Sequence, residues 1–200
     1  MTKNQQLEQT LKANKGFITS REAREAGIAT FSLLSFTRKE GMMRVDRGFY
    51  ARKNWDIDEY LVFQRRYSKF IFSYESALYL WNLTDKIVSN LVVTGPYGYH
   101  PYSNKRSDVE THLERDPSIY KLGIVSVKTI FGNEVFAYDK EKTICDIINR
   151  REEMESETFV KALRFYEEAK DKDPQKLMKY AKSMGIEKAV SDIMEIIGKV

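Results

Sequence analysis

Residues 16–50 constrain the fold more than any other stretch of the chain, because they hold two short helical patterns in succession and then a compact basic hairpin. A first helix is predicted at about residues 20–26 and a second at about residues 31–40. A glycine follows each pattern, where it can close the helix in a left-handed conformation. This order of elements predicts a winged helix-turn-helix.

The start of each predicted helix carries side chains that can cap it. Thr19 or Ser20 can cap the first helix, and Glu22 can return a hydrogen bond to Thr19 as in a capping box. Thr30 or Ser32 can cap the second helix. Both helices are therefore expected to begin close to these residues.

The second helix is amphipathic. Leu33 and Phe36 fall on one face, beside Leu34, and are expected to dock against the rest of the domain. The opposite face carries side chains that can bond base edges or phosphates in a major groove, namely Thr30, Ser32, Ser35, Arg38 and Lys39. The apolar face docks, and the polar face is free to contact DNA.

A short two-stranded wing is predicted after this helix. Met43 and Val45 alternate with polar neighbours, and the dipeptide Arg47-Gly48 turns the chain into a second strand at residues 49–51. The wing carries a cluster of basic side chains, namely Arg44, Arg47, Arg52 and Lys53. Short capped helices with a hairpin also occur in many structural domains, where surface Arg and Lys are merely solvated.

The distribution of charge favours the DNA-binding interpretation. Residues 1–53 hold 11 Lys+Arg against 5 Asp+Glu, a net charge of +6, whereas residues 54–200 hold 22 against 24, a net charge of −2. The basic excess therefore belongs to the first quarter of the chain, and this asymmetry indicates a phosphate partner.

The remainder of the chain predicts a connector and a second domain. Residues 54–70 are expected to form a connector helix, capped by Asp56 and carrying the basic pair Arg65 and Arg66. Residues 71–200 alternate strand and helix patterns and end in helical ones, so the fold class is α+β, a winged helix followed by a mixed α/β domain with a C-terminal helical bundle. The predicted helices are 74–82, which Ser73 can cap, 139–148 and three beyond, and the predicted strands are 91–94, 109–113, 122–127 and 134–138.

A tyrosine-rich loop at residues 97–102 follows the strand at 91–94. Lys105 and Arg106 stand just beyond it and are candidates for additional nucleic-acid or partner contacts, together with Arg65 and Arg66. The tyrosines can pack across the loop, stack on bases or contact a protein partner. Packing is the favoured alternative.

No catalytic or metal site is predicted from the residues. The chain lacks a Gly-rich phosphate loop and the GxSxG and HExxH motifs, and its one cysteine, Cys145, and two histidines give no zinc-ligand spacing. No segment approaches the ~20 apolar residues of a membrane span. We therefore expect a soluble, cytoplasmic protein without cofactor, metal or membrane partner.

Several motifs together resemble the AbiEi family, the antitoxins of the AbiE-type abortive-infection (type IV) toxin-antitoxin systems. In the first domain these are GFIT at 16–19, GI at 27–28 and RVDRGFY at 44–50. In the second domain they are FSYESAL at 72–78, LVVT at 91–94 and EKTICD at 141–146. The resemblance covers nearly the whole chain, and the coupling of SYESAL to EKTICD is its most distinctive part.

The resemblance implies an antitoxin that is not an enzyme and has two activities. The first domain would bind inverted repeats in double-stranded promoter DNA and repress its own operon, with two copies paired on the DNA. The second domain would neutralise a cognate nucleotidyltransferase-like toxin without forming a stable complex. Arg44, Arg47 and Tyr50 match the wing motif of the family, while the residues of the second helix match by position alone.

Two other classes of function remain open at this stage. One is a nucleic-acid- or nucleotide-modifying enzyme that a winged helix positions, and the other is an adaptor that binds a partner through the tyrosine loop. Carboxylates near predicted strands, such as Asp108 and Glu134, form no tight DxD or ExK pair, so solvated carboxylates are favoured over metal ligands.

Overall fold

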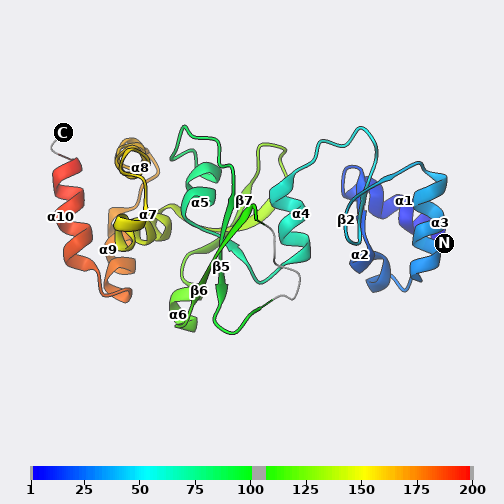
Figure 1. Ribbon diagram of the computed structural model, residues 1–200, viewed down its shortest axis with the longest axis horizontal. Helices are drawn as coiled ribbons and strands as arrows, with labels where there is room; N and C mark the ends of the chain where they lie inside the picture. Colours follow the sequence, from blue (N-terminus) through cyan, green and yellow to red (C-terminus); the bar gives the residue numbers. More distant parts are fainter. Residues whose placement is uncertain (1, 101–106, 199–200) are drawn as a thin grey trace. The chain divides into compact units, whose positions relative to one another are not determined.

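The computed structural model describes residues 2–100 and 107–198, which form two compact units (Figure 1). Unit 1 is Met1–Val62 and unit 2 is Phe63–Val200. The division falls inside helix α4 (Glu59–Arg66), within the segment 54–70 predicted to connect two domains. Each unit combines helices with one sheet. The fold is therefore a mixed α/β one, which agrees with the predicted α+β class.

Unit 1 places three helices around a three-stranded antiparallel sheet of order β1-β3-β2. Both predicted helices and the predicted hairpin are present. The strand β1 was not predicted, and it pairs with β3 from Phe17 opposite Ala51 to Thr19 opposite Phe49. Its elements are α1 (Lys3–Ala13), β1 (Phe17–Thr19), α2 (Ser20–Glu25), α3 (Thr30–Lys39), β2 (Met43–Asp46) and β3 (Phe49–Ala51).

The capping expectation is confirmed for α2 and wrong for α3. At α2, Thr19 Oγ1 accepts from the Glu22 N–H at 3.2 Å, and Glu22 Oε2 accepts from the Thr19 N–H at 2.8 Å. At α3 the N-cap residue is Ala29, which gives no side-chain hydrogen bond. Thr30 is already helical and Ser32 lies one turn inside the helix, so neither hydroxyl can cap it.

The hydrophobic core of unit 1 contains residues from all three helices and from the sheet. Its buried residues are Leu7, Leu11, Ile18, Ala23, Ile28, Leu33 and Phe36. Gly27 and Gly41, which follow α2 and α3, have φ of +70° and +61° and so close these helices as predicted. The tight connections let two short helices bury their apolar faces against one core.

Helix α4 begins later than the sequence indicated. Asp58, and not Asp56, caps it, because Asp58 Oδ1 accepts from the Leu61 N–H at 3.2 Å and Asp58 is fully buried. Further along, Gln64 bridges backbone groups of unit 2, since its amide donates to the Phe136 carbonyl at 2.9 Å and accepts from the Phe136 N–H. Gln64 thus bonds to both backbone groups of Phe136 and links α4 to β8.

Unit 2 is built on a mixed five-stranded sheet of order β6-β5-β4-β8-β7. Strands β5 and β6 are parallel, as are β4 and β8, whereas β4–β5 and β7–β8 are antiparallel. The elements after α4 are β4 (Ile71–Phe72), α5 (Tyr74–Leu80), β5 (Leu91–Pro96), β6 (Val109–Glu114), α6 (Pro117–Lys121), β7 (Ile124–Lys128), β8 (Glu134–Tyr138), α7 (Lys140–Asn149), η1 (Arg151–Glu153), α8 (Ser156–Glu168), α9 (Pro174–Ser183) and α10 (Glu187–Ile197).

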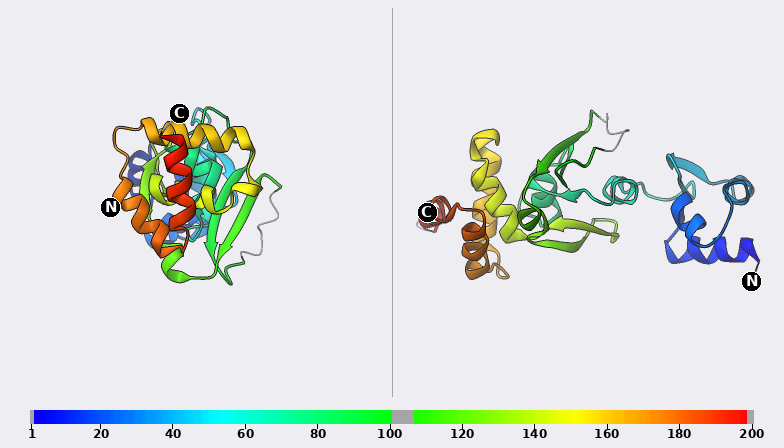
Figure 2. Two further views of the ribbon diagram at one scale, coloured as in Figure 1. Left: turned by 90° about the vertical axis from the view of Figure 1, so that its left-hand side faces the viewer. Right: turned by 90° about the horizontal axis from the view of Figure 1, so that it is seen from below.

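Helix α7 lies at the centre of the helical part of unit 2. It contacts α5, α8, α9 and α10, and its residues 141–148 are all buried. The last three helices gather beside one end of the sheet (Figure 2). The hydrophobic core here runs from Tyr74 and Leu78 of α5 through α7 to Val190 of α10.

Three sequence predictions for unit 2 need correction. The helix predicted at 74–82 ends at Leu80. Ser73 is the N-cap residue of α5 as predicted, but its side chain makes no capping hydrogen bond; its Oγ instead accepts from Thr94 Oγ1 of β5 at 2.9 Å. Helix α6, which begins at Pro117 behind the capping residue Asp116, was not predicted, because five residues are too few for a periodic pattern.

Candidate nucleic-acid interface

Helix α3 presents one exposed face and one buried face. Leu33 and Phe36 are buried, as predicted. Of the five side chains predicted to contact DNA, Ser32 is half-buried, and Thr30, Ser35, Arg38 and Lys39 are exposed. The structure therefore brings four of the five together on the surface of one helix.

Thr37 separates these two faces near the end of α3. It is buried, and its hydroxyl donates to the Leu34 carbonyl at 3.0 Å within the same helix. Because this bond satisfies the hydroxyl internally, Thr37 behaves as a core residue, and Arg38 and Lys39 extend the exposed face to the last turn.

The β2–β3 hairpin is anchored to α2. The Ser20 N–H donates to the Gly48 carbonyl at 2.7 Å, and a Cβ on Gly48 would lie 3.2 Å from Ser20 Oγ. Gly48 also has φ of +75°, a conformation that disfavours other residues. These constraints fix the turn of the hairpin, and Arg44 and Arg47 project from it into solvent.

The remaining predicted contacts of the hairpin differ in exposure. Arg52 and Lys53 are exposed at the end of β3. Tyr50 is half-buried and packs against the core of unit 1. It therefore supports the hairpin through packing and offers less surface than the arginines.

The basic side chains of this surface are not neutralised by carboxylates. Within the described part of the chain, Arg38, Lys39, Arg47 and Arg52 form no ion pair, whereas Arg21 of α2 pairs with Glu25 at 2.9 Å. Arg44 Nε has a long contact of 3.4 Å to the Asp46 carbonyl. Unpaired cations on an exposed surface can contact phosphates without first losing an internal partner.

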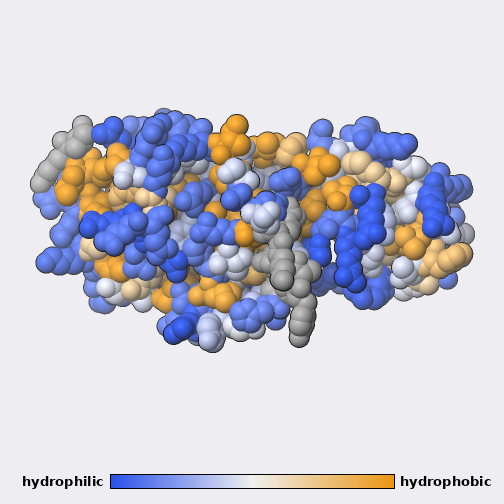
Figure 3. All heavy atoms as spheres, in the orientation of Figure 1, coloured by the Kyte–Doolittle hydropathy of each residue, from blue (hydrophilic) through white to orange (hydrophobic). Residues whose placement is uncertain are grey.

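Phe31 is an exposed aromatic residue on α3 that the sequence prediction did not include. It is 79 % exposed, compared with 43 % for Phe131 and 50 % for Phe136. Apolar side chains are visible at the surface of unit 1 among hydrophilic ones (Figure 3). The signal in the sequence was its spacing, because Phe31 lies four residues before Ser35 and seven before Arg38, on the polar face.

Four basic residues of unit 2 were predicted to make additional nucleic-acid or partner contacts. Arg65 is exposed, and the guanidinium of Arg66 lies 5.1 Å from the centre of the Tyr67 ring. Lys105 and Arg106 lie outside the described residues. The structure therefore bears on two of these four positions.

The described part of the tyrosine loop shows both packing and exposure. Tyr99 packs edge-on against Phe70 with ring centres 5.1 Å apart, and Lys69 Nζ lies 5.2 Å from the Tyr99 ring centre. Partial burial raises the pKa of Tyr99. Tyr97 is 63 % exposed, with the Arg115 guanidinium 5.2 Å from its ring centre. Tyr99 therefore packs within the fold, as the favoured interpretation predicted, whereas Tyr97 is accessible to solvent.

A buried ion pair lies in α7 of unit 2. Lys142 Nζ contacts Asp146 Oδ1, and the side chains are 3 % and 7 % exposed. Lys142 Nζ also lies 4.4 Å from the centre of the Tyr138 ring. Burial raises the pKa of Asp146 although Lys142 opposes the shift. Both residues belong to α7, so the pair joins two successive turns of this helix in a site that is closed to solvent.

Two other titratable groups of unit 2, Cys145 and His112, have shifted pKa values. Burial raises the pKa of the Cys145 thiol to about 12, so the group is protonated at neutral pH. Burial and the nearby Arg150 lower the pKa of His112. No group of three or more metal-ligating side chains is present among residues 2–100 and 107–198. Over the same residues, no helix is long and apolar enough to cross a membrane.

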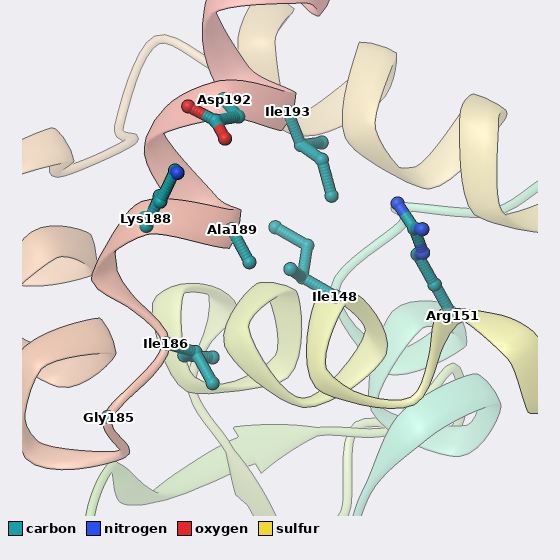
Figure 4. Close-up of a pocket in the computed structure, with 8 residues that line it drawn as sticks. All are labelled: Ile148, Arg151, Gly185, Ile186, Lys188, Ala189, Asp192 and Ile193. Atoms are coloured by element: carbon teal, nitrogen blue, oxygen red, sulfur yellow. The ribbon is translucent and has the colours of Figure 1, made fainter.

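A shallow pocket of about 480 Å³ lies between α7 and α10 (Figure 4). Ile148, Ile186 and Ile193 line it, and Arg151, Lys188 and Asp192 stand at its margin. The pocket is apolar inside and lacks a convergent set of polar groups. It therefore gives no indication of a specific small-molecule ligand.

Comparison with known proteins adds information on the fold. No protein-family model matches the chain, and no curated protein matches it. Among solved structures, the chain is similar to the crystal structure of the RV2827C protein from Mycobacterium tuberculosis, with a TM-score of 0.55 over 91 % of this chain and 72 % of that one. The two sequences are 14 % identical, so the similarity concerns the fold alone.

Proposed function

We propose that unit 1 is a winged helix-turn-helix that binds double-stranded DNA, with α3 as the recognition helix and the β2–β3 hairpin as the wing. The observation that carries this proposal is the exposed face of α3, on which Ser35, Arg38 and Lys39 stand, while Leu33 and Phe36 of the same helix are buried. The unpaired arginines of the hairpin would contact the phosphate backbone beside the groove that α3 enters.

The basic excess supports this assignment. The net charge of +6 on residues 1–53 contrasts with −2 on the remainder. Phosphate neutralisation supplies most of the non-specific affinity for DNA, so a chain with this asymmetry would approach DNA through unit 1.

We further propose that the chain is an antitoxin of the AbiEi type that represses its own operon. Unit 1 would bind inverted repeats in the promoter, and unit 2, with its C-terminal helices as a bundle, would counter a nucleotidyltransferase-like toxin without a stable complex. The protein would act in the cytoplasm and would need no catalytic residue or cofactor. The motifs shared with the family, above all SYESAL and EKTICD, support this proposal.

Binding should require two copies on an inverted repeat, because one winged helix offers a small interface for specific recognition. Electrophoretic titration of the full chain on a single half-site and on the complete repeat tests this requirement. The repeat should bind more tightly and cooperatively than the half-site. Equal affinity for both would contradict the paired arrangement.

The two activities should separate genetically. A chain with Lys39→Ala and Arg47→Ala should lose repression of a promoter reporter and still rescue growth when the neighbouring toxin gene is induced. The matched control changes Lys182 and Lys188 to Ala, two exposed cations of unit 2 with the same total charge. Loss of rescue in the unit 1 variant, with the protein folded, would contradict the division of activities.

A further inference from the structure

The Phe31 side chain lies outside the core of unit 1. Its side chain is 79 % exposed, whereas Leu33 and Phe36 of the same helix are 1 % and 4 % exposed and fill the core. Burial of a phenylalanine side chain stabilises a folded protein, and Phe31 makes no such contribution because it is exposed. Phenylalanine is also a weaker helix former than alanine. An exposed phenylalanine in this helix therefore points to a contact outside the folded chain.

The position of Phe31 places it at the leading end of the exposed face. It is the second residue of α3, and its spacing puts it on one face with Ser35 and Arg38. Side chains of a helix lean towards its N-terminus, so a side chain at this position is directed towards the start of α3. In a helix-turn-helix, the N-terminal residues of the recognition helix are those that reach base edges.

The chemistry of the Phe31 ring indicates which group of the DNA it would contact. A phenyl ring offers no hydrogen-bond donor or acceptor, and in the major groove the apolar group that distinguishes one base from the others is the C5-methyl of thymine. Ser35 and Arg38 on the same face can supply the polar contacts to neighbouring positions. The exposed face thus carries one apolar side chain and several polar ones. Together they can make both kinds of contact by which proteins distinguish bases, namely apolar contacts and hydrogen bonds.

We propose that Phe31 is a specificity-determining residue that contacts a thymine methyl group in the major groove. This inference rests on the proposed binding of DNA by unit 1. It adds a sequence preference to that function, namely an A·T pair at the position that the start of α3 reaches in each half-site.

The test uses the full chain and a duplex selected by it from a random pool. Each thymine of the bound site is replaced in turn by uracil, which removes the methyl group and keeps base pairing. At one thymine per half-site, uracil should weaken binding by about fourfold, the factor that corresponds to ~0.8 kcal/mol for one buried methyl(ene) group. Phe31→Ala should bind the thymine duplex roughly three- to tenfold more weakly and should no longer distinguish thymine from uracil.

Controls separate this contact from general effects. Ile130→Ala removes an apolar side chain that is 76 % exposed in unit 2, and it should keep both affinity and the thymine preference. Phe31→Ala should keep the melting temperature, since the side chain is exposed, and the salt dependence of binding, since no phosphate contact is lost.

The possible results are distinct. A Phe31→Ala variant that retains the preference for thymine, or that weakens binding equally to thymine and uracil duplexes at every position, would overturn the assignment of Phe31 while leaving DNA binding intact. Absence of saturable binding of the wild-type chain to any duplex would overturn the proposed function and this inference together.

Discussion

Replacement of Lys142 by Met should strongly destabilise unit 2 at neutral pH. The ammonium group of Lys142 contacts Asp146 in a site where both side chains are almost fully buried. The other oxygen, Asp146 Oδ2, has no hydrogen-bond partner among the described residues. Removal of the ammonium leaves a buried carboxylate without its ion-pair partner, a change that costs about 3–5 kcal/mol of unfolding free energy.

The double variant Lys142→Met/Asp146→Leu provides the comparison. It removes both charges and replaces them with apolar groups of similar size, so it should lose far less stability than the single variant, by an amount of order 1 kcal/mol or less. This non-additivity would identify the buried charge, and not the loss of packing, as the source of the effect.

The destabilisation should also depend on pH. Burial raises the pKa of Asp146 in the folded chain, and removal of Lys142 raises it further, because Lys142 lowers this pKa. The folded state then holds a proton that the unfolded state loses above the ordinary aspartate pKa of about 3.9, so stability falls as pH rises through this region. The cost of Lys142→Met should therefore be smaller at pH 5 than at pH 7.5.

Urea unfolding followed by tryptophan fluorescence measures these quantities. The chain has two tryptophans, and a Trp55→Phe background leaves Trp81, whose Nε1 donates to the Tyr138 carbonyl at 2.7 Å in unit 2. Fluorescence then reports on the unit that carries the substitution. A cost below about 1 kcal/mol at pH 7.5, or an equal cost at both pH values, would refute this account of the pair.

Two further predictions concern the surroundings of α7. Gly123→Ala should destabilise unit 2 by about 2–5 kcal/mol, because φ is +73° and the new Cβ would lie 2.8 Å from Lys142 Cβ and 3.0 Å from Asp139 Oδ1. Gly132→Ala, with φ of +74° and open space around it, should lose only about 1–2 kcal/mol in the same urea measurement, and equal costs would contradict the steric argument. Cys145 should react with a chromogenic disulfide reagent only after unfolding, because it is fully buried and its pKa is raised to about 12, and rapid reaction of the native protein would contradict this.

Local rules predicted much of unit 1. The capping box of Thr19 and Glu22, the glycines behind α2 and α3, and the turn at Gly48 each act within a few residues, so their signals are readable in the sequence. The pairing of β1 with β3 was missed because three residues are too short for an alternating pattern and their partners lie 30–34 residues away in the sequence.

Non-local packing limited the prediction of unit 2. The buried state of Glu141, Lys142 and Asp146 could not be read from a segment as polar as EKTICD, because it results from helices that cover α7 from several sides. The local rule placed Ser73 at the N-cap of α5, but it could not show that the hydroxyl bonds to Thr94 of β5 and not to the helix.

For the candidate interface, the structure tests only the exposure of the predicted side chains. The exposure of Ser35, Arg38 and Lys39 follows from helical periodicity, and the structure agrees. Phe31 was missed because an apolar side chain is expected in a core unless the space available to it is known. The basic residues Lys105 and Arg106 lie outside the described residues, so their contribution stays a prediction.

The salt dependence of DNA binding tests the central claim most directly. Affinity of the full chain for its selected repeat should be measured from 50 to 200 mM salt, a range chosen to resolve the slope of log affinity against log salt. If Lys39 and Arg47 each contact one phosphate, Lys39→Ala/Arg47→Ala should make this slope less steep by about 1.8 for each bound copy, whereas the control Lys182→Ala/Lys188→Ala should keep the wild-type slope. An unchanged slope and affinity in the unit 1 variant would contradict the placement of the DNA interface on α3 and the hairpin.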